Sequence, residues 1–132
     1  MKNTYPALQK QIPKIISKHV YGNLYKINLS LLTDLQFLTK MVVESARLGN
    51  LHIVELATKK FSDVNGIPGR VSIIGILEES HIALHTWPES GYATLDIYSC
   101  GQESDPEASF KYIVSELDPK KQKVWYADRS NK

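Results

Sequence analysis

One short stretch of the chain, residues 79–101, holds two histidines, a tryptophan, several hydroxyls and the only cysteine of the protein. Residues 82–85 and 92–100 alternate between apolar and polar side chains, a period of two that predicts β-strands with one buried and one open face. The Pro-Glu-Ser-Gly sequence between them is typical of a turn. The stretch is therefore predicted to form a β-hairpin. Its polar face would carry a base and a thiol, His85 and Cys100.

The histidines of this hairpin do not predict a metal site. His81 and His85 are four residues apart, which on a strand is about 13 Å at ~3.3 Å per residue. Two ligands of one ion must each approach it to ~2 Å, so this separation is too large. A sheet with one wet face also alternates without any active site, and a lone cysteine is often only a small hydrophobe. The pattern alone favours neither an active site on this face nor an ordinary solvent-facing surface.

The identities of the residues are more informative than their alternation. The sequences Glu79-Ser80-His81, His85-Thr86-Trp87-Pro88-Glu89 and Cys100-Gly101 resemble those of the S-adenosylmethionine decarboxylase proenzymes of the small prokaryotic, pyruvoyl-dependent type. The resemblance is close over residues 71–106 and looser from His19 to the C-terminus. It implies an enzyme of polyamine biosynthesis whose product would be the aminopropyl donor for spermidine.

The resemblance further implies that the chain makes its own cofactor. Ser80 would attack the carbonyl of Glu79, and the resulting ester would break by β-elimination. The chain would then separate into a β chain, residues 1–79, and an α chain, residues 80–132. Residue 80 would carry a pyruvoyl group that forms a Schiff base with the substrate. This group would supply the electron sink that decarboxylation requires, with no pyridoxal phosphate and no metal.

Four other side chains receive roles from the same resemblance. His85 matches the family's processing base, and Ser72 matches a serine that assists processing. Cys100 matches the residue that returns a proton to the α-carbon of the substrate. A thiol with its ordinary pKa of about 8.5 is protonated at neutral pH, as a proton donor must be. Glu89 matches the acidic residue that binds the ribose hydroxyls of the substrate.

One position departs from the family pattern and bears on the substrate. The family carries Phe-x-Pro before its Val-Ser strand entry, and that Phe stacks on adenine, a contact worth about 1–3 kcal/mol per base. Here Pro68 aligns, but Gly66 stands at the Phe position. Phe61 could reach in from elsewhere, and Glu89 keeps the ribose contact, so S-adenosylmethionine is the favoured substrate. The alternative is arginine or ornithine, whose basic side chain would need a carboxylate from Asp63, Glu78 or Glu89.

A third alternative is an inactive paralogue that serves as a partner subunit. Such a chain is expected to have lost part of the machinery, whereas Ser80, His85 and Cys100 are all present. Activity is therefore the preferred prediction.

Length and composition fit one small globular domain. The chain has 132 residues and a net charge of +2, which does not favour nucleic acid as a partner. No run reaches the ~18 apolar residues of a membrane helix, no apolar secretory segment is present, and a free thiol fits a reducing cytoplasm. We expect a cytoplasmic protein with a small amino-acid-type substrate and no membrane partner. The resemblance implies a homodimer with its sites near the subunit interface.

Periodicity predicts the elements that must position these residues. Residues 1–17 are expected to be a basic N-terminal extension, and residues 18–132 the decarboxylase domain. Strands are predicted over 19–27, 51–61, 71–78 and around Val124 and Tyr126, besides the hairpin, and helices over 34–48 and 105–117. In the second strand, Ile53, Glu55 and Ala57 are expected to alternate against Val54 and Leu56. This order predicts an α+β two-layer sandwich, a mostly antiparallel sheet with two helices on one face.

Overall fold

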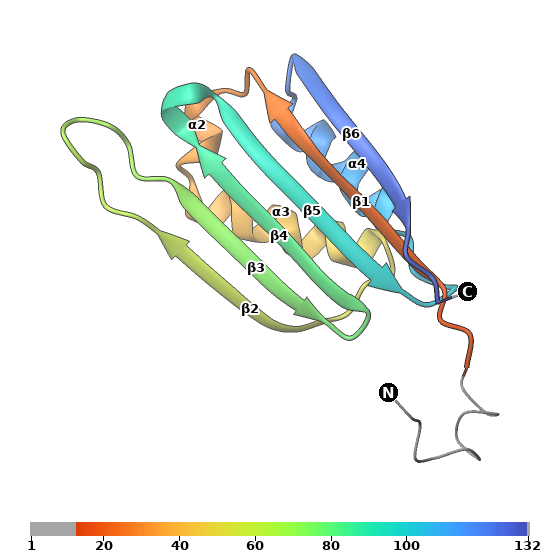
Figure 1. The fold of residues 1–132 in the computed structure, drawn as a ribbon. Helices are drawn as coiled ribbons and strands as arrows, with labels where there is room; N and C mark the ends of the chain where they lie inside the picture. The colour runs from red at the N-terminus through yellow and green to blue at the C-terminus, as the bar shows by residue number, and fades with distance from the viewer. Residues whose placement is uncertain (1–12, 132) are drawn as a thin grey trace, which may run out of the picture.

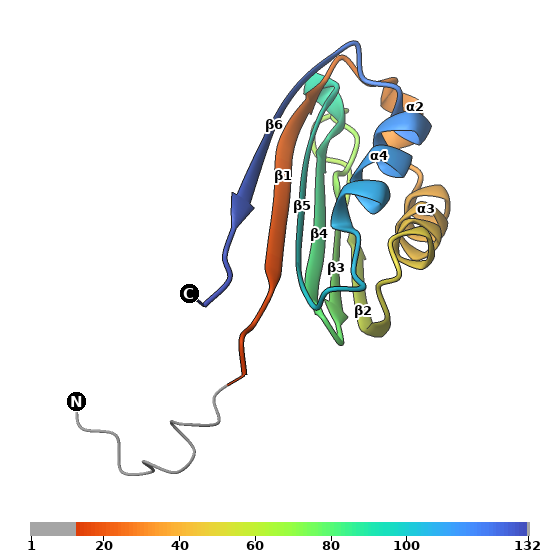
Figure 2. The same cartoon turned by 90° about the vertical axis from the view of Figure 1, so that its right-hand side faces the viewer.

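The computed structural model describes residues 13–131, and within them the chain forms a six-stranded sheet with helices on one face (Figures 1 and 2). The strand order is β2-β3-β4-β5-β1-β6, and every neighbouring pair is antiparallel. The strands are β1 (Ser17–Tyr25), β2 (Ile53–Lys60), β3 (Val71–Leu77), β4 (Ser80–Trp87), β5 (Tyr92–Cys100) and β6 (Lys121–Asp128). The α-helices are α2 (Leu29–Leu32), α3 (Leu35–Leu48) and α4 (Pro106–Leu117). The predicted α+β sandwich is confirmed.

The two long helices begin where their capping residues predict. The Asp34 carboxylate accepts the backbone N–H of Phe37 at the start of α3, at 3.0 Å. At the start of α4, Asp105 accepts the N–H of Ala108 at 3.1 Å and Pro106 occupies the first turn. A cap of this kind satisfies backbone donors that have no partner within the helix.

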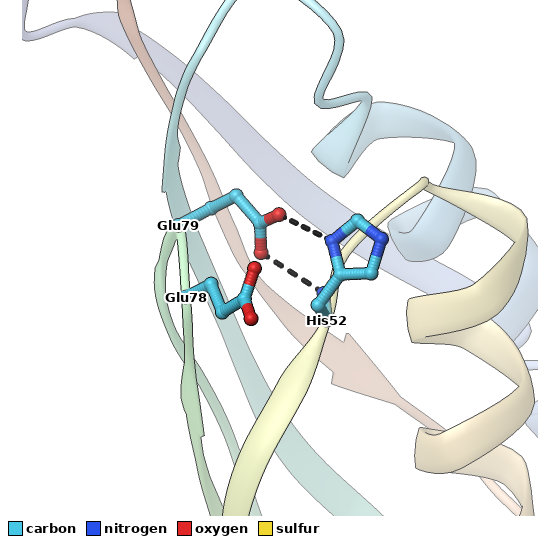
Figure 3. Close-up of side chains that lie close together, drawn as sticks. All are labelled: His52, Glu78 and Glu79. Carbon is cyan, nitrogen blue, oxygen red and sulfur yellow. Dashed lines mark hydrogen bonds and ion pairs between the residues drawn. The ribbon is translucent and has the colours of Figure 1, made fainter.

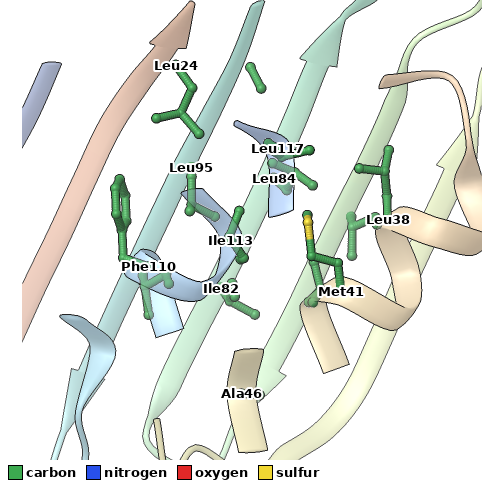
Figure 4. Packing of buried hydrophobic residues seen from close by; sticks show 14 of the residues in the cluster. Leu24, Leu38, Met41, Ala46, Ile82, Leu84, Leu95, Phe110, Ile113 and Leu117 are labelled. Atoms are coloured by element: carbon green, nitrogen blue, oxygen red, sulfur yellow. The ribbon is translucent and has the colours of Figure 1, made fainter. Parts of the chain in front are cut away.

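The core lies between the helices and the sheet (Figure 4). Alternate residues of the hairpin strands are buried, and the residues between them are only half-buried. This confirms the two faces predicted for residues 82–85 and 92–100. The buried strand residues pack in one cluster with helix residues, among them Leu38, Met41, Phe110, Ile113 and Leu117.

Three details differ from the sequence prediction. The short helix α2 was not predicted. In β2, a bulge between Ile53 and Glu55 breaks the expected alternation. Consequently Ile53 and Leu56, three residues apart, both pack against the core. The predicted N-terminal extension lies largely outside the described residues, and its last residue, Ser17, is the first of β1.

The face of the sheet opposite the helices is open and rich in aromatic and apolar side chains. Ile74 and Ile76 on β3 are 46% and 51% exposed on this face. Trp125 on β6 stacks on Tyr21 of β1, with ring centroids 5.8 Å apart. Among the described residues, no helix is both long enough and apolar enough to cross a membrane.

Candidate functional site

The predicted cleavage bond lies in the tight connection between β3 and β4. Leu77 pairs with Ser80 across this connection, so Glu78 and Glu79 form the turn. The carbonyl oxygen of Glu79 accepts the backbone N–H of Cys100 at 2.8 Å. Ser80 has a φ of +154°, a region that L-residues rarely adopt and that stores backbone strain. The bond is thus held with an oriented carbonyl on one side and a strained serine on the other.

The side chain of Glu79 is also held, by a residue that the sequence did not single out. The backbone N–H of His52 donates to one carboxylate oxygen at 2.9 Å, and its Nδ1 lies 2.6 Å from the other (Figure 3). The hydrogen bond to Glu79 raises the pKa of the His52 imidazole above its ordinary value of 6.5. Burial alone would raise the pKa of the Glu79 carboxyl, but the hydrogen bonds from His52 outweigh burial and lower it. No pattern around residue 52 predicts this contact, because it depends on how the start of β2 meets the turn.

A second group of predicted residues lies on β3 and β4, away from the turn that joins them. Ser72 on β3 is paired with His85 on β4, and Ser72 Oγ lies 2.9 Å from His85 Nδ1. This hydrogen bond fixes the orientation of the imidazole ring. Because Nδ1 is engaged by Ser72, Nε2 is the ring nitrogen left to contact a ligand.

Strand geometry separates the predicted site residues into two groups. Ser80 and His85 are five residues apart on β4, which is about 16 Å at ~3.3 Å per residue. We call the group Glu79, Ser80 and Cys100 the cleavage end, and the group Ser72, His85 and Glu89 the histidine end. Hydrogen bonds join Glu79 to Cys100 within the cleavage end and Ser72 to His85 within the histidine end, and the strand spacing keeps His85 away from Ser80 within one chain.

A pocket of about 600 Å³ adjoins the histidine end. Its lining includes Phe61, Arg70, Trp87 and Glu89, the last from the 3₁₀ turn η1 (Pro88–Ser90). The guanidinium of Arg70 lies 5.4 Å from the centroid of the Phe61 ring and 6.0 Å from that of Trp87. Gly66 is exposed and is not part of the lining, and a Cβ there would meet nothing within 4 Å. The position of the family's stacking Phe thus supplies no wall to this pocket.

The open face carries a polar network to which the sequence motifs assign no role. Asp96 on β5 contacts Nε2 of His19 at 2.9 Å and Nε2 of His81 at 3.3 Å. The ring of Tyr98 lies against both histidines, and the guanidinium of Arg129 lies over it. The alternation of β5 places Asp96 and Tyr98 on this face, but only the strand order brings His19 beside them.

Comparison with known proteins agrees with this architecture and with the sequence motifs. The family model described as S-adenosylmethionine decarboxylase matches residues 18–130. An arginine decarboxylase proenzyme of Hyperthermus butylicus is 50% identical over 117 residues, which cover 89% of this chain and 80% of that protein. The crystal structure of the adenosylmethionine decarboxylase from Aquifex aeolicus VF5 superposes with a TM-score of 0.78 at 26% identity, covering 89% of this chain and 92% of that one. The chain belongs to the S-adenosylmethionine decarboxylase family.

Proposed function

We propose that the protein cuts itself between Glu79 and Ser80 and then acts as a pyruvoyl-dependent amino-acid decarboxylase. The observation that carries this proposal is the geometry of the bond itself. The Glu79 carbonyl accepts the Cys100 N–H at 2.8 Å, and the next residue is a serine with a strained, positive φ. A donor aimed at a carbonyl oxygen stabilises the negative charge that develops when a nucleophile adds to that carbonyl.

In this proposal Ser80 Oγ adds to the carbonyl carbon of Glu79, and the bond from that carbon to the Ser80 nitrogen breaks, leaving an ester. A base then removes the α-proton of residue 80, and the bond between its Cβ and Oγ breaks, which forms dehydroalanine and releases the Glu79 carboxylate. Hydrolysis of the remaining dehydroalanine releases ammonia and leaves a pyruvoyl group at residue 80. Once formed, this group supplies an electron sink for decarboxylation. The Cys100 thiol is the proton donor to the α-carbon after CO₂ has left.

The proposal requires a second copy of the chain. His85 lies about 16 Å from Ser80 along β4, too far to act on it within one chain. Two copies packed through their open faces could place the histidine end of one beside the cleavage end of the other. The exposed Ile74 and Ile76 on that face support such packing, because exposed apolar patches mark contact surfaces.

For the substrate, we propose arginine ahead of S-adenosylmethionine. One support is the 50% identity to a protein named as an arginine decarboxylase proenzyme. The other is that Gly66, at the position of the family's adenine-stacking Phe, does not line the pocket. Glu89 lines the pocket, and its carboxylate could receive a guanidinium in a bidentate contact. S-adenosylmethionine remains the second candidate, because Phe61 shares this pocket with Glu89 and could stack on adenine.

Two measurements test this function. Intact mass under denaturing conditions should show two fragments that meet at Glu79–Ser80, with pyruvoyl in place of Ser80. The Ser80→Ala variant should stay whole, and Ser115→Ala, which removes a hydroxyl from the exposed side of α4, should be cut normally. Release of CO₂ from arginine, ornithine and S-adenosylmethionine, assayed side by side, then ranks the substrates. A wild-type chain that stays whole after prolonged incubation would overturn the proposal.

A further inference from the structure

His52 forms hydrogen bonds with both the backbone and a side chain of the turn that carries the cleavage bond. It lies outside every motif of the family resemblance. Its carbonyl accepts the N–H of Glu78 at 2.9 Å. Its own N–H and its Nδ1 contact the two carboxylate oxygens of Glu79. Figure 3 shows how the His52 ring meets the Glu79 side chain. Because the Cys100 N–H also donates to the Glu79 carbonyl, Glu79 is held at both its backbone and its side chain.

We propose that His52 is a positioning residue for self-cleavage, holding Glu79 so that its carbonyl carbon stays within reach of Ser80 Oγ. This inference rests on the proposed self-cleavage. Intramolecular attack depends on the reacting atoms being kept in a narrow range of distances and angles. A two-residue turn between strands would otherwise leave the Glu79 side chain free in solvent. The carboxylate anchors the turn to the start of β2, a strand that takes no other part in the cleavage end.

The charges around the imidazole favour this contact. The carboxylates of Glu78 and Glu79 both face it, with ligand atoms of the three side chains within 4.8 Å of one another. Arg47, which lines the same shallow surface pocket as His52, is engaged by Glu44. The ring is therefore surrounded by net negative charge, which favours its protonated form. In that form both ring nitrogens carry a proton, so Nδ1 always donates to the carboxylate. In the neutral ring the proton can sit on Nε2 instead, which leaves a lone pair facing the carboxylate.

The chain offers a matched set of variants. His52→Ala removes the ring contact and keeps the backbone contacts. His52→Asn places an amide donor at the position of Nδ1, and this donor does not titrate. Arg47→Ala removes a nearby exposed cation that does not touch the turn, and it serves as the control. Cleavage is followed as the fraction of cut chain over time in freshly purified precursor.

We expect His52→Ala to slow cleavage about five- to tenfold, which corresponds to roughly 1–1.4 kcal/mol of barrier. His52→Asn should restore most of the rate, and Arg47→Ala should cleave as the wild type does. The ratio of the wild-type rate to the His52→Asn rate should fall as pH rises through the raised pKa of His52, since only the imidazole loses its proton. In the Glu79→Ala background, His52→Ala should have no further effect.

The outcomes separate this inference from the function on which it rests. If the wild type is cut but His52→Ala is cut equally fast, or if Asn does not restore the rate, the positioning role is wrong and the self-cleaving enzyme stands. If the wild type is not cut at all, both are overturned. An imidazole titration of His52 by NMR in the uncleavable Ser80→Ala precursor gives a readout that does not depend on cleavage. A pKa at or below the ordinary value would mean that the contact with Glu79 is absent in solution, and the inference would fail.

Discussion

The backbone N–H of Cys100 donates a 2.8 Å hydrogen bond to the carbonyl oxygen of Glu79. Cys100 thus has two separable parts at the cleavage end: a backbone donor on the carbonyl that Ser80 would attack, and a thiol predicted to act later on the substrate. Side-chain substitution removes the second part and keeps the first, because every residue except proline retains its N–H.

We therefore expect Cys100→Ala to be cut at nearly the wild-type rate and to decarboxylate poorly. Loss of a positioned proton donor lowers the rate by about a hundredfold or more, so kcat should fall by about that factor with little change in KM. Intact mass gives the extent of cleavage, and CO₂ release gives kcat. An uncut Cys100→Ala chain would mean that the thiol itself takes part in cleavage, contrary to this division of roles.

The separation of Ser80 from His85 along β4 leads to a complementation experiment. Ser80→Ala and His85→Ala should each remain whole when expressed alone. When the two are co-expressed, a mixed dimer of the proposed kind would pair an intact Ser80 with an intact His85. Cleavage should then appear, and only in the His85→Ala chains, which mass identifies.

Co-expression of His85→Ala with the Ser80→Ala/His85→Ala double variant is the control. No dimer in this mixture contains His85, so no cleavage is expected. If His85→Ala cuts itself when expressed alone, His85 is not the processing base. If the first mixture stays whole while each variant is folded, the two ends do not meet across a dimer.

The pocket beside the histidine end predicts how the substrate is held. If Glu89 receives the guanidinium of arginine, Glu89→Gln should raise KM for arginine about tenfold or more, since a charge-assisted contact becomes a neutral one. The effect on kcat should be smaller. Glu55→Gln, which removes an exposed carboxylate from β2, should leave KM unchanged.

Phe61→Ala separates the two substrate candidates. Decarboxylation of arginine should change little, because arginine offers no ring to stack. Decarboxylation of S-adenosylmethionine, if Phe61 supports the adenine, should lose about 5- to 150-fold in kcat/KM, the equivalent of ~1–3 kcal/mol of stacking. Steady-state kinetics with both substrates on the same preparation measure this difference.

Local patterns predicted the sheet faces and the caps well, because these depend on neighbours in sequence. Alternation placed His85 and Cys100 on the open face, and Asp34 and Asp105 mark where helices begin. The bulge between Ile53 and Glu55 shifts the register of β2, and a period-two pattern does not predict such a shift. The contact of His52 with Glu79 joins the start of β2 to the turn between β3 and β4. No local sequence pattern predicts it, because the two segments are distant in the chain. The resemblance to the family proposes the site residues, and the five-residue spacing of Ser80 and His85 along β4 assigns them to two separate ends.

The pair formed by His52 and Glu79 also predicts a pH dependence of stability. The pKa of His52 is raised above 6.5, so its contribution is fully present below that pH and is lost as pH rises through the folded-state value. The pKa of Glu79 is lowered from 4.5, so its contribution is present above that pH and is lost as pH falls through the folded-state value. The pair should therefore stabilise the uncleavable Ser80→Ala precursor most between pH 4.5 and 6.5.

Urea midpoints of this precursor, with and without His52→Asn, measure the effect across pH. The difference between the two should shrink as pH rises above 6.5. The imidazole loses its positive charge over this range, whereas the Asn amide is uncharged at every pH. Glu44→Gln is the matched control, since it removes an exposed carboxylate whose partner, Arg47, stays charged throughout. Its effect on stability should stay constant over the same range, because the pKa of Glu44 is lowered from 4.5 and its carboxylate is already ionised. A His52→Asn difference that does not change with pH would mean that the imidazole charge contributes nothing to holding the turn.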